Sequence, residues 1–385
     1  MLTKNISFKN FKVKKNNSKI KRIFSSLIKE KNEVLLSMSK NYKNFFNNKI
    51  INKYKNNYNF RVIGMGGSTL GTQAIYDFLE NKIKKKFSFL DNLQANKERN
   101  EKKKITNLIV SKSGNTIETI VNSNIFIKKN HKNIFITENK NNYLFQLAQK
   151  IKAEIIHHNN YIGGRYSVLS EVGMLPAELM GLKSEKFRQY NSLIKNKNFL
   201  SSLIKNVNST LSFIKNKKFN SIIINYDERS ENLFKWYQQL VAESLGKKSK
   251  GILPIISPMP SDNHSLLQLY LDGPKNNFFT FFSTQNEKTD KINYRWLQKS
   301  HLYLKDKSFS KILYAQKTAT EKVFIQKKIP FRSFDIRKRN EEVLGELFCF
   351  FILETILLGR ALKVNPFDQP SVELIKKETK KILIN

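Results

Sequence analysis

The chain has 385 residues, enough for two or three domains, and its single cysteine, Cys349, excludes an internal disulfide. A formal net charge of +38 is typical of proteins that bind nucleic acid or anionic membranes, but only 11 of the 69 basic residues are arginine and the lysines are spread along nearly the whole chain. We therefore expect no nucleic-acid partner. The N-terminus lacks the apolar core of a signal peptide and no apolar run predicts a membrane span, so we expect a cytoplasmic protein without a membrane partner.

The predicted elements divide the chain into five parts. Residues 1–57 are polar-faced and predict an N-terminal helical segment. Over residues 58–181, short apolar runs alternate with helical stretches, which is typical of a parallel sheet flanked by helices. Residues 182–217 are rich in lysine and asparagine and predict a helical bridge. The alternation restarts over 218–340, and a helical segment over 341–385 follows, so the sequence predicts an α/β fold with two similar halves.

The first glycine-rich loop, "RVIGMGGSTLG" over residues 61–71, joins an apolar strand to a helix. At such a junction, unpaired N–H groups and the helix dipole favour a phosphate or a carboxylate. Gly64 and Gly66 fit a dinucleotide fingerprint, but its third glycine is replaced by Thr69. Asp91 follows the next strand, where nucleotide-binding folds keep a ribose-binding acid. A nucleotide-dependent enzyme and a glycine turn without a ligand therefore remain as alternatives.

The second junction, "NLIVSKSGNTIET", brings three hydroxyl groups to one helix start. Hydroxyls and backbone amides together can saturate the oxygens of a phosphate monoester without a metal ion. A P-loop would need a Gly-Lys-Ser/Thr ending, which this stretch lacks. Ordinary helix capping would explain one hydroxyl better than three. The residues that we expect to surround an anion here are Ser111, Lys112, Ser113 and Thr116.

Six segments, in order along the chain, resemble the signature segments of the glucose-6-phosphate isomerase family. They are "GMGGSTLG", "VSKSGNTIET", "GGRYSVLSEVGMLPA", "WYQQLVAESLGKKSKG", "NHSLLQLYLDG" and "NPFDQPSVELIKK". The resemblance implies two sugar-isomerase (SIS) subdomains with the active site between them, and a homodimer. It also implies reversible conversion of glucose 6-phosphate to fructose 6-phosphate through a cis-enediol, with no cofactor and no metal.

The resemblance also assigns roles to single residues. Glu243 would be the base that moves a proton between C2 and C1, and Arg165 would stabilise the charge of the enediolate. His264, supplied by the partner subunit, would open the sugar ring with the help of Lys376. The remaining positions would hold substrate: Gly67 and Ser68, with Ser111, Lys112, Ser113 and Thr116, at the phosphate, and Gln369 elsewhere on the sugar.

The residues also allow plainer interpretations. Without the resemblance, Glu243 is a surface acid paired with Lys247 four residues on, and His264 is a capping or core group. Two related functions also stay open, namely a non-catalytic SIS-type regulator that binds sugar phosphate, and a broader isomerase that also accepts mannose 6-phosphate. No cluster of His, Cys, Asp and Glu has metal-ligand spacing, so we expect no metal.

Overall fold

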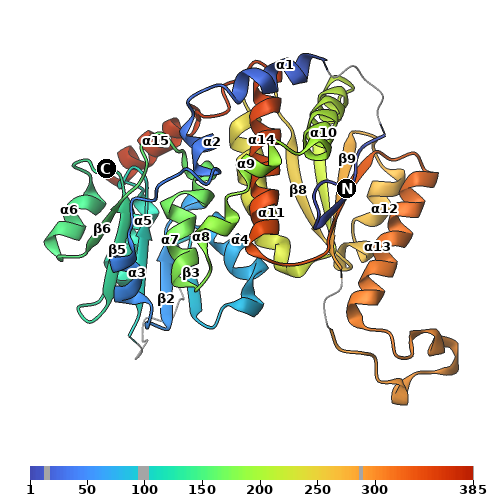
Figure 1. The fold of residues 1–385 in the computed structure, drawn as a ribbon, viewed down its shortest axis with the longest axis horizontal. Coiled ribbons are helices and arrows are strands. Elements are labelled where there is room, and N and C mark those ends of the chain that lie inside the picture. Colours follow the sequence, from blue (N-terminus) through green and yellow to red (C-terminus); the bar gives the residue numbers. More distant parts are fainter. Residues whose placement is uncertain (13–17, 94–103, 286–288, 385) are drawn as a thin grey trace.

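A computed structural model describes residues 1–12, 18–93, 104–285 and 289–384 of the chain. It contains two five-stranded sheets, which lie side by side with helices between and around them (Figure 1). The strands are short apolar runs, and those at the centre of each sheet are buried on both faces, as expected for parallel strands covered by helices.

The first sheet has the strand order β3-β2-β4-β5-β6 and all of its strands are parallel. The strands are β2 (Asn59–Ile63), β3 (Lys86–Leu90), β4 (Thr106–Val110), β5 (Lys132–Thr137) and β6 (Glu154–His157). The helices of this part of the chain are α4 (Leu70–Phe78), α5 (Ile117–Phe126), α6 (Tyr143–Lys150) and α7 (Glu171–Leu179). Because the strand order reverses between β2 and β4, the loops that follow these two strands lead apart at the carboxyl edge of the sheet, the place where open α/β sheets bind ligands.

The second sheet repeats this arrangement with the order β8-β7-β9-β10 and adds β1 at its edge. Its parallel strands are β7 (Asn220–Asn225), β8 (Leu253–Pro258), β9 (Asn277–Thr284) and β10 (Phe331–Ile336). Strand β1 (Ile6–Lys9) pairs antiparallel with β10. We expected residues 6–9 inside a helical segment. They form a strand because β10 has an edge with which they pair, and this pairing buries Ile6.

The other helices surround and connect these sheets. They are α1 (Ser18–Leu27), α2 (Glu33–Ser37), α3 (Asn48–Tyr54), α8 (Ser184–Phe187), α9 (Tyr190–Leu193), α10 (Lys197–Lys215), α11 (Glu231–Leu245), α12 (Leu267–Asp272), α13 (Phe309–Gln326), α14 (Glu341–Ala361) and α15 (Val372–Ile384). None of the helices in the described ranges is both long and apolar enough to cross a bilayer.

Helices α11 and α14 lie at the centre of the molecule, between the two sheets (Figure 1). Helix α14 is apolar on nearly all sides and is therefore buried along most of its length. Helix α11 packs against α4 on the first-sheet side and against β8 and α14 on the other. Side chains near the end of α11 therefore lie where the two halves meet, and this position defines the candidate site.

Candidate active site

The loop after β2 lies directly on the backbone of the "GGRYS" segment. The loop makes one 3-10 turn, Gly66–Ser68, before α4 begins. A Cβ atom added to Gly67 would lie 2.2 Å from the carbonyl carbon of Gly164 and 2.4 Å from the nitrogen of Arg165. Real Cβ atoms do not approach backbone so closely, so this position requires glycine. The tight packing holds the loop after β2 against the segment that carries Arg165.

The loop after β4 gathers the predicted hydroxyl groups at the start of α5. The hydroxyls of Ser111 and Thr116 are hydrogen-bonded at 2.9 Å, and Ser113 Oγ accepts from the backbone N–H of Asn115. Lys112 points to another loop, where its Nζ donates to the carbonyl of Asn160 at 2.7 Å. Burial lowers the pKa of Lys112. Strands β2 and β4 are neighbours, so the two loops share one edge of the first sheet.

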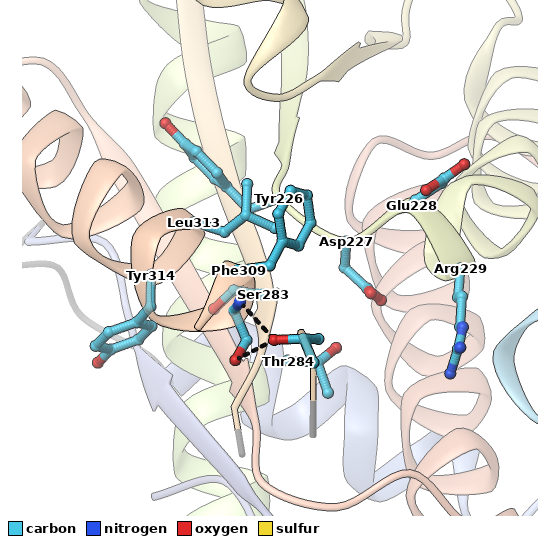
Figure 2. A pocket seen from close by; sticks show the side chains of 11 residues that line it. Tyr226, Asp227, Glu228, Arg229, Ser283, Thr284, Phe309, Leu313 and Tyr314 are labelled. Atoms are coloured by element: carbon cyan, nitrogen blue, oxygen red, sulfur yellow. Dashed lines mark hydrogen bonds between the residues drawn. The ribbon is translucent and has the colours of Figure 1, made fainter. Parts of the chain in front are cut away.

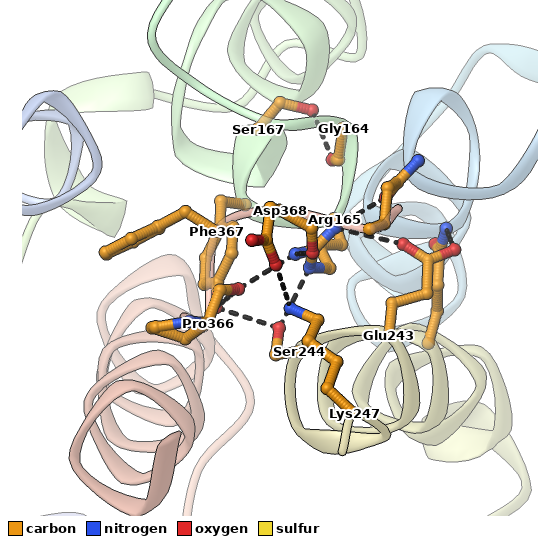
Figure 3. Close-up of polar contacts among 12 residues, drawn as sticks. Gly164, Arg165, Ser167, Glu243, Ser244, Lys247, Pro366, Phe367 and Asp368 are labelled. Atoms are coloured by element: carbon orange, nitrogen blue, oxygen red, sulfur yellow. Dashed lines mark hydrogen bonds and ion pairs between the residues drawn. The ribbon is translucent and has the colours of Figure 1, made fainter. Parts of the chain in front are cut away.

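Arg165 is the centre of the site, and its side chain is only 2% exposed. Its guanidinium group has five N–H donors, and five hydrogen bonds use all of them (Figure 3). The acceptors are Ser244 Oγ (2.8 Å from Nε), Glu243 Oε2 and Gln369 Oε1 (3.2 and 2.6 Å from Nη1), and the carbonyls of Pro366 and Asp368 (2.8 and 2.9 Å from Nη2). Arg165 therefore joins the first half of the chain to α11 and to the segment between α14 and α15.

Glu243 lies in the last turn of α11, and about a third of its side chain (30%) is exposed. One carboxylate oxygen accepts from Gln239 Nε2 at 2.9 Å, and the other faces Arg165. The alternative pairing with Lys247 is not what the structure contains, because Lys247 bonds to Asp368 at 2.7 Å. The carboxylate is thus oriented from two sides and remains accessible from outside.

Sequence reasoning missed Gln239, which contacts both the base candidate and the first glycine loop. A Cβ atom on Gly66 would lie 2.7 Å from Gln239 Nε2, and the other amide atom, Oε1, is buried with no hydrogen-bond partner among the described residues. Gln239 precedes Glu243 by four residues on the same helix, so the i, i+4 spacing was the signal that could have identified it.

Three predicted residues remain, and the first of them bonds to Arg165 within the chain. Gln369 meets Arg165, as described above. His264 is exposed on the turn Ser261–His264 after β8, and no hydrogen bond or ion pair links it to Arg165 or Glu243 in the described ranges. Lys376 is exposed on α15. Within one chain, hydrogen bonds therefore join Arg165 to Glu243 and Gln369, and His264 takes no part in these bonds.

A comparison with known protein families identifies the chain. The sequence model described as phosphoglucose isomerase matches residues 14–254. The chain belongs to the phosphoglucose isomerase family. The glucose-6-phosphate isomerase of Methanocaldococcus jannaschii is 31% identical over 348 residues, 85% of each chain. That of Mycoplasmopsis pulmonis is 32% identical and covers 84% of this chain and 82% of the relative.

Solved structures resemble this member of the phosphoglucose isomerase family in fold. A hypothetical protein from Thermus thermophilus has a TM-score of 0.83 at 23% identity, covering 96% of this chain and 95% of its own. A glucose-6-phosphate isomerase from Chlamydia trachomatis has a TM-score of 0.70 at 18% identity, covering 97% of this chain and 76% of its own. These likenesses confirm the expected fold class, an α/β protein with two parallel sheets flanked by helices.

The nucleotide alternative depended on Asp91, which has a hydrogen-bond partner within the protein. Asp91 accepts a hydrogen bond from Gln73 Nε2 of α4 at 2.7 Å, so its carboxylate is held by the protein. Among the described residues, no group of three or more His, Cys, Asp or Glu side chains is arranged to hold a metal ion. The site is best described by its arginine, its carboxylate and its two hydroxyl- and glycine-rich loops.

A cavity of about 190 Å³ lies in the second half, at the carboxyl ends of β7 and β9 (Figure 2). By strand order, this place corresponds to the two loops after β2 and β4 in the first half. Asp227, the second residue after β7, lines the cavity at the position that Met65 has after β2, and it pairs with Arg339. Ser283 donates to Asp335 at 2.7 Å. Since none of the predicted site residues lines this cavity and an acid occupies it, it is a poor counterpart of an anion site.

Proposed function

We propose that this chain is a glucose-6-phosphate isomerase, which interconverts glucose 6-phosphate and fructose 6-phosphate. Membership of the phosphoglucose isomerase family supports the reaction. The observation that supports the site is the meeting of Arg165 and Glu243 beside two loops suited to a phosphate. Arg165 and Glu243 belong to other segments than the two loops. An anion held by the loops would therefore lie next to the Glu243 carboxylate and the Arg165 guanidinium.

In the proposed reaction, the phosphate lies between the two loops of the first half. The backbone N–H of Gly67 and the hydroxyls of Ser68, Ser111, Ser113 and Thr116 would donate to its oxygens, and Lys112 would add positive charge. A phosphate held this way needs no metal ion to balance it. Because the loops follow neighbouring strands, both can reach one ligand without rearrangement of the sheet.

Glu243 would take the proton from C2 of the open-chain sugar and return it to C1. The proton transfer needs a carboxylate that a ligand can reach, and the 30% exposure of the Glu243 side chain meets this need. Arg165 would stabilise the enediolate oxygen. Since all five donors of Arg165 are in use, the substrate must replace one acceptor, and Gln369 is the candidate because it is an exposed residue at the end of a loop.

Ring opening would be the task of His264 and Lys376, with His264 supplied by a second subunit. The exposure of His264, which leaves it accessible to a second subunit, supports this arrangement. Helix α15, which carries Lys376, also has an exposed apolar surface that a partner could cover. This surface consists of Leu374, Ile375, Ile382, Leu383 and Ile384.

The first test is the rate of conversion of fructose 6-phosphate by the purified protein, compared with Glu243→Gln. We expect the substitution to reduce kcat on the order of 10³-fold, since general base catalysis contributes about 10² to 10⁴. Glu231→Gln is the matched control, because Glu231 lies on the same helix in a surface pair with Lys235. A folded but inactive native protein that still binds fructose 6-phosphate would instead favour the sugar-phosphate-binding regulator. Mannose 6-phosphate, assayed in parallel, decides between the strict and the broader isomerase.

Mixing two inactive variants tests the homodimer. If His264 acts across the interface, a dimer of one Glu243→Gln subunit and one His264→Ala subunit keeps one intact site. Random exchange of subunits then restores roughly a quarter of the native activity, because half of the dimers are mixed and each has one working site. If His264 serves its own subunit, every site in the mixture lacks one residue, and no activity returns.

A further inference from the structure

The turn between α14 and α15, residues 365–368, is held from two directions (Figure 3). From one side, Arg165 donates to the carbonyls of Pro366 and Asp368, and Tyr166 donates its hydroxyl to the same Pro366 carbonyl at 3.0 Å. From the other side, Lys247 pairs with the Asp368 carboxylate at 2.7 Å and donates to the carbonyl of Asn365. We call residues 365–368 the C-terminal turn.

Besides these bonds, apolar packing holds the middle of the C-terminal turn, where Pro366 is buried next to Gly359 of α14 and the Phe367 ring lies 5.5 Å from the Tyr166 ring, centroid to centroid. Asn365, Asp368 and the following residues up to Ser371 are exposed, although Pro366 is buried. Inside the turn, Asn365 accepts from the Phe367 N–H at 3.0 Å and donates to Asp368 at 3.1 Å. These local bonds shape the turn but do not attach it to the body of the protein. The polar attachment of the turn comes from Arg165, Tyr166 and Lys247, and at its exposed end, Asp368, the only side-chain ion pair among the described residues is the one with Lys247.

The side chain of Lys247 is fixed in place by its contacts with the C-terminal turn. Its side chain is only 11% exposed, although it comes just after the end of α11, where a lysine can readily extend into solvent. Its ammonium faces both a carboxylate and a backbone carbonyl, and the hydrogen bond from Lys247 lowers the pKa of Asp368. A buried ammonium with two acceptors holds its partner more firmly than an exposed pair does.

We infer that Lys247 is a positioning residue of the isomerase site, which keeps the C-terminal turn docked and thereby places Gln369 and the helix that carries Lys376. The inference rests on the proposed function. In the proposed reaction Arg165 gives up its bond to Gln369 when substrate binds and keeps only its two bonds to the backbone carbonyls of Pro366 and Asp368. Lys247 makes no bond to Arg165 or Glu243, so its hold on the turn persists through that exchange.

The test compares Lys247→Met and Lys247→Arg with the native protein, using fructose 6-phosphate. We expect Lys247→Met to lower kcat by about 10- to 100-fold, since a misplacement of about 1 Å can cost 10²-fold. KM should change less than about threefold, because the phosphate loops are untouched. Lys247→Arg, which keeps the charge and the donors, should recover most of kcat. Hydrogen exchange of amides in residues 369–384 should be faster in Lys247→Met only.

Two further variants make the outcome decisive. Lys235→Met is the control for loss of an ion-paired lysine, this one on α11 itself, and it should leave kcat and hydrogen exchange unchanged. Asp368→Asn removes the carboxylate from an exposed position and should act in the same direction as Lys247→Met if that variant fails to fold. Native kcat in a folded Lys247→Met, or a loss that Lys247→Arg does not recover, would overturn the inference. An inactive native protein would contradict the proposed function instead, while exchange still reports whether Lys247 holds the turn.

Discussion

Replacing Gly67 by alanine tests whether the two loops at the site depend on direct backbone contact. The added Cβ would lie 2.2 Å from the carbonyl carbon and 2.4 Å from the carbonyl oxygen of Gly164, and 2.4 Å from the nitrogen of Arg165. Carbon atoms in contact prefer about 3.5 to 4.0 Å, so the loops must separate by roughly 1 Å or more. Both sides are backbone, which cannot rotate away as a side chain can. We therefore expect a loss of about 3 kcal/mol in the free energy of unfolding, the upper end for overpacking.

Urea unfolding of Gly67→Ala beside Gly163→Ala measures this loss. Gly163 has a φ of −68°, which alanine adopts readily, and its added Cβ would have only Tyr166 Cδ2 within contact, at 3.9 Å. We expect Gly163→Ala to unfold within about 0.5 kcal/mol of the native protein. In the isomerase assay, Gly67→Ala should lose roughly 10²-fold in rate, because Arg165 moves with its backbone. Equal unfolding free energies for the two variants would refute the argument.

Two predictions concern buried charge elsewhere in the fold. Arg332 and Glu354, each 2% exposed, form an ion pair, so Arg332→Met leaves an unpaired buried carboxylate and should cost about 3 to 5 kcal/mol in urea unfolding. Lys327→Met, which removes the exposed pair with Asp272, should cost less than about 1 kcal/mol, and similar losses for both would contradict the reasoning. Burial raises the pKa of Glu346 from its ordinary 4.5 to about 7. The unfolded chain then releases this proton at lower pH than the folded chain does. The contribution of Glu346 to the free energy of unfolding therefore falls as pH rises from 4.5 to 7, by up to about 3 kcal/mol. Unfolding free energies measured across this range should decline less for Glu346→Gln than for the native protein, and parallel curves would show that Glu346 does not titrate there.

Local patterns in the sequence were sufficient to predict the parallel strands of both sheets. Alternating or continuous apolar runs mark β2, β4, β7 and β9, and the helix starts after β2 and β4 follow from glycine and hydroxyl residues next to those runs. The apolar pattern of a short segment is a property of its own residues, so these elements can be recognised one at a time. The resemblance of six ordered segments likewise identified the family, because it depends on residue identity alone.

Partnerships between distant residues depended on the folded arrangement. Gln369 lies 204 residues beyond Arg165, and no local spacing indicates that they bond. Lys247 follows Glu243 by four residues, which favours an i, i+4 pair, yet it turns to Asp368 because the C-terminal turn brings a carboxylate and a carbonyl within reach. Residues 6–9 become a strand only when β10 presents an edge. In each case the free energy of the contact depends on a residue that is distant in the sequence and becomes a neighbour only in the folded chain. The local sequence pattern does not indicate which residue that is.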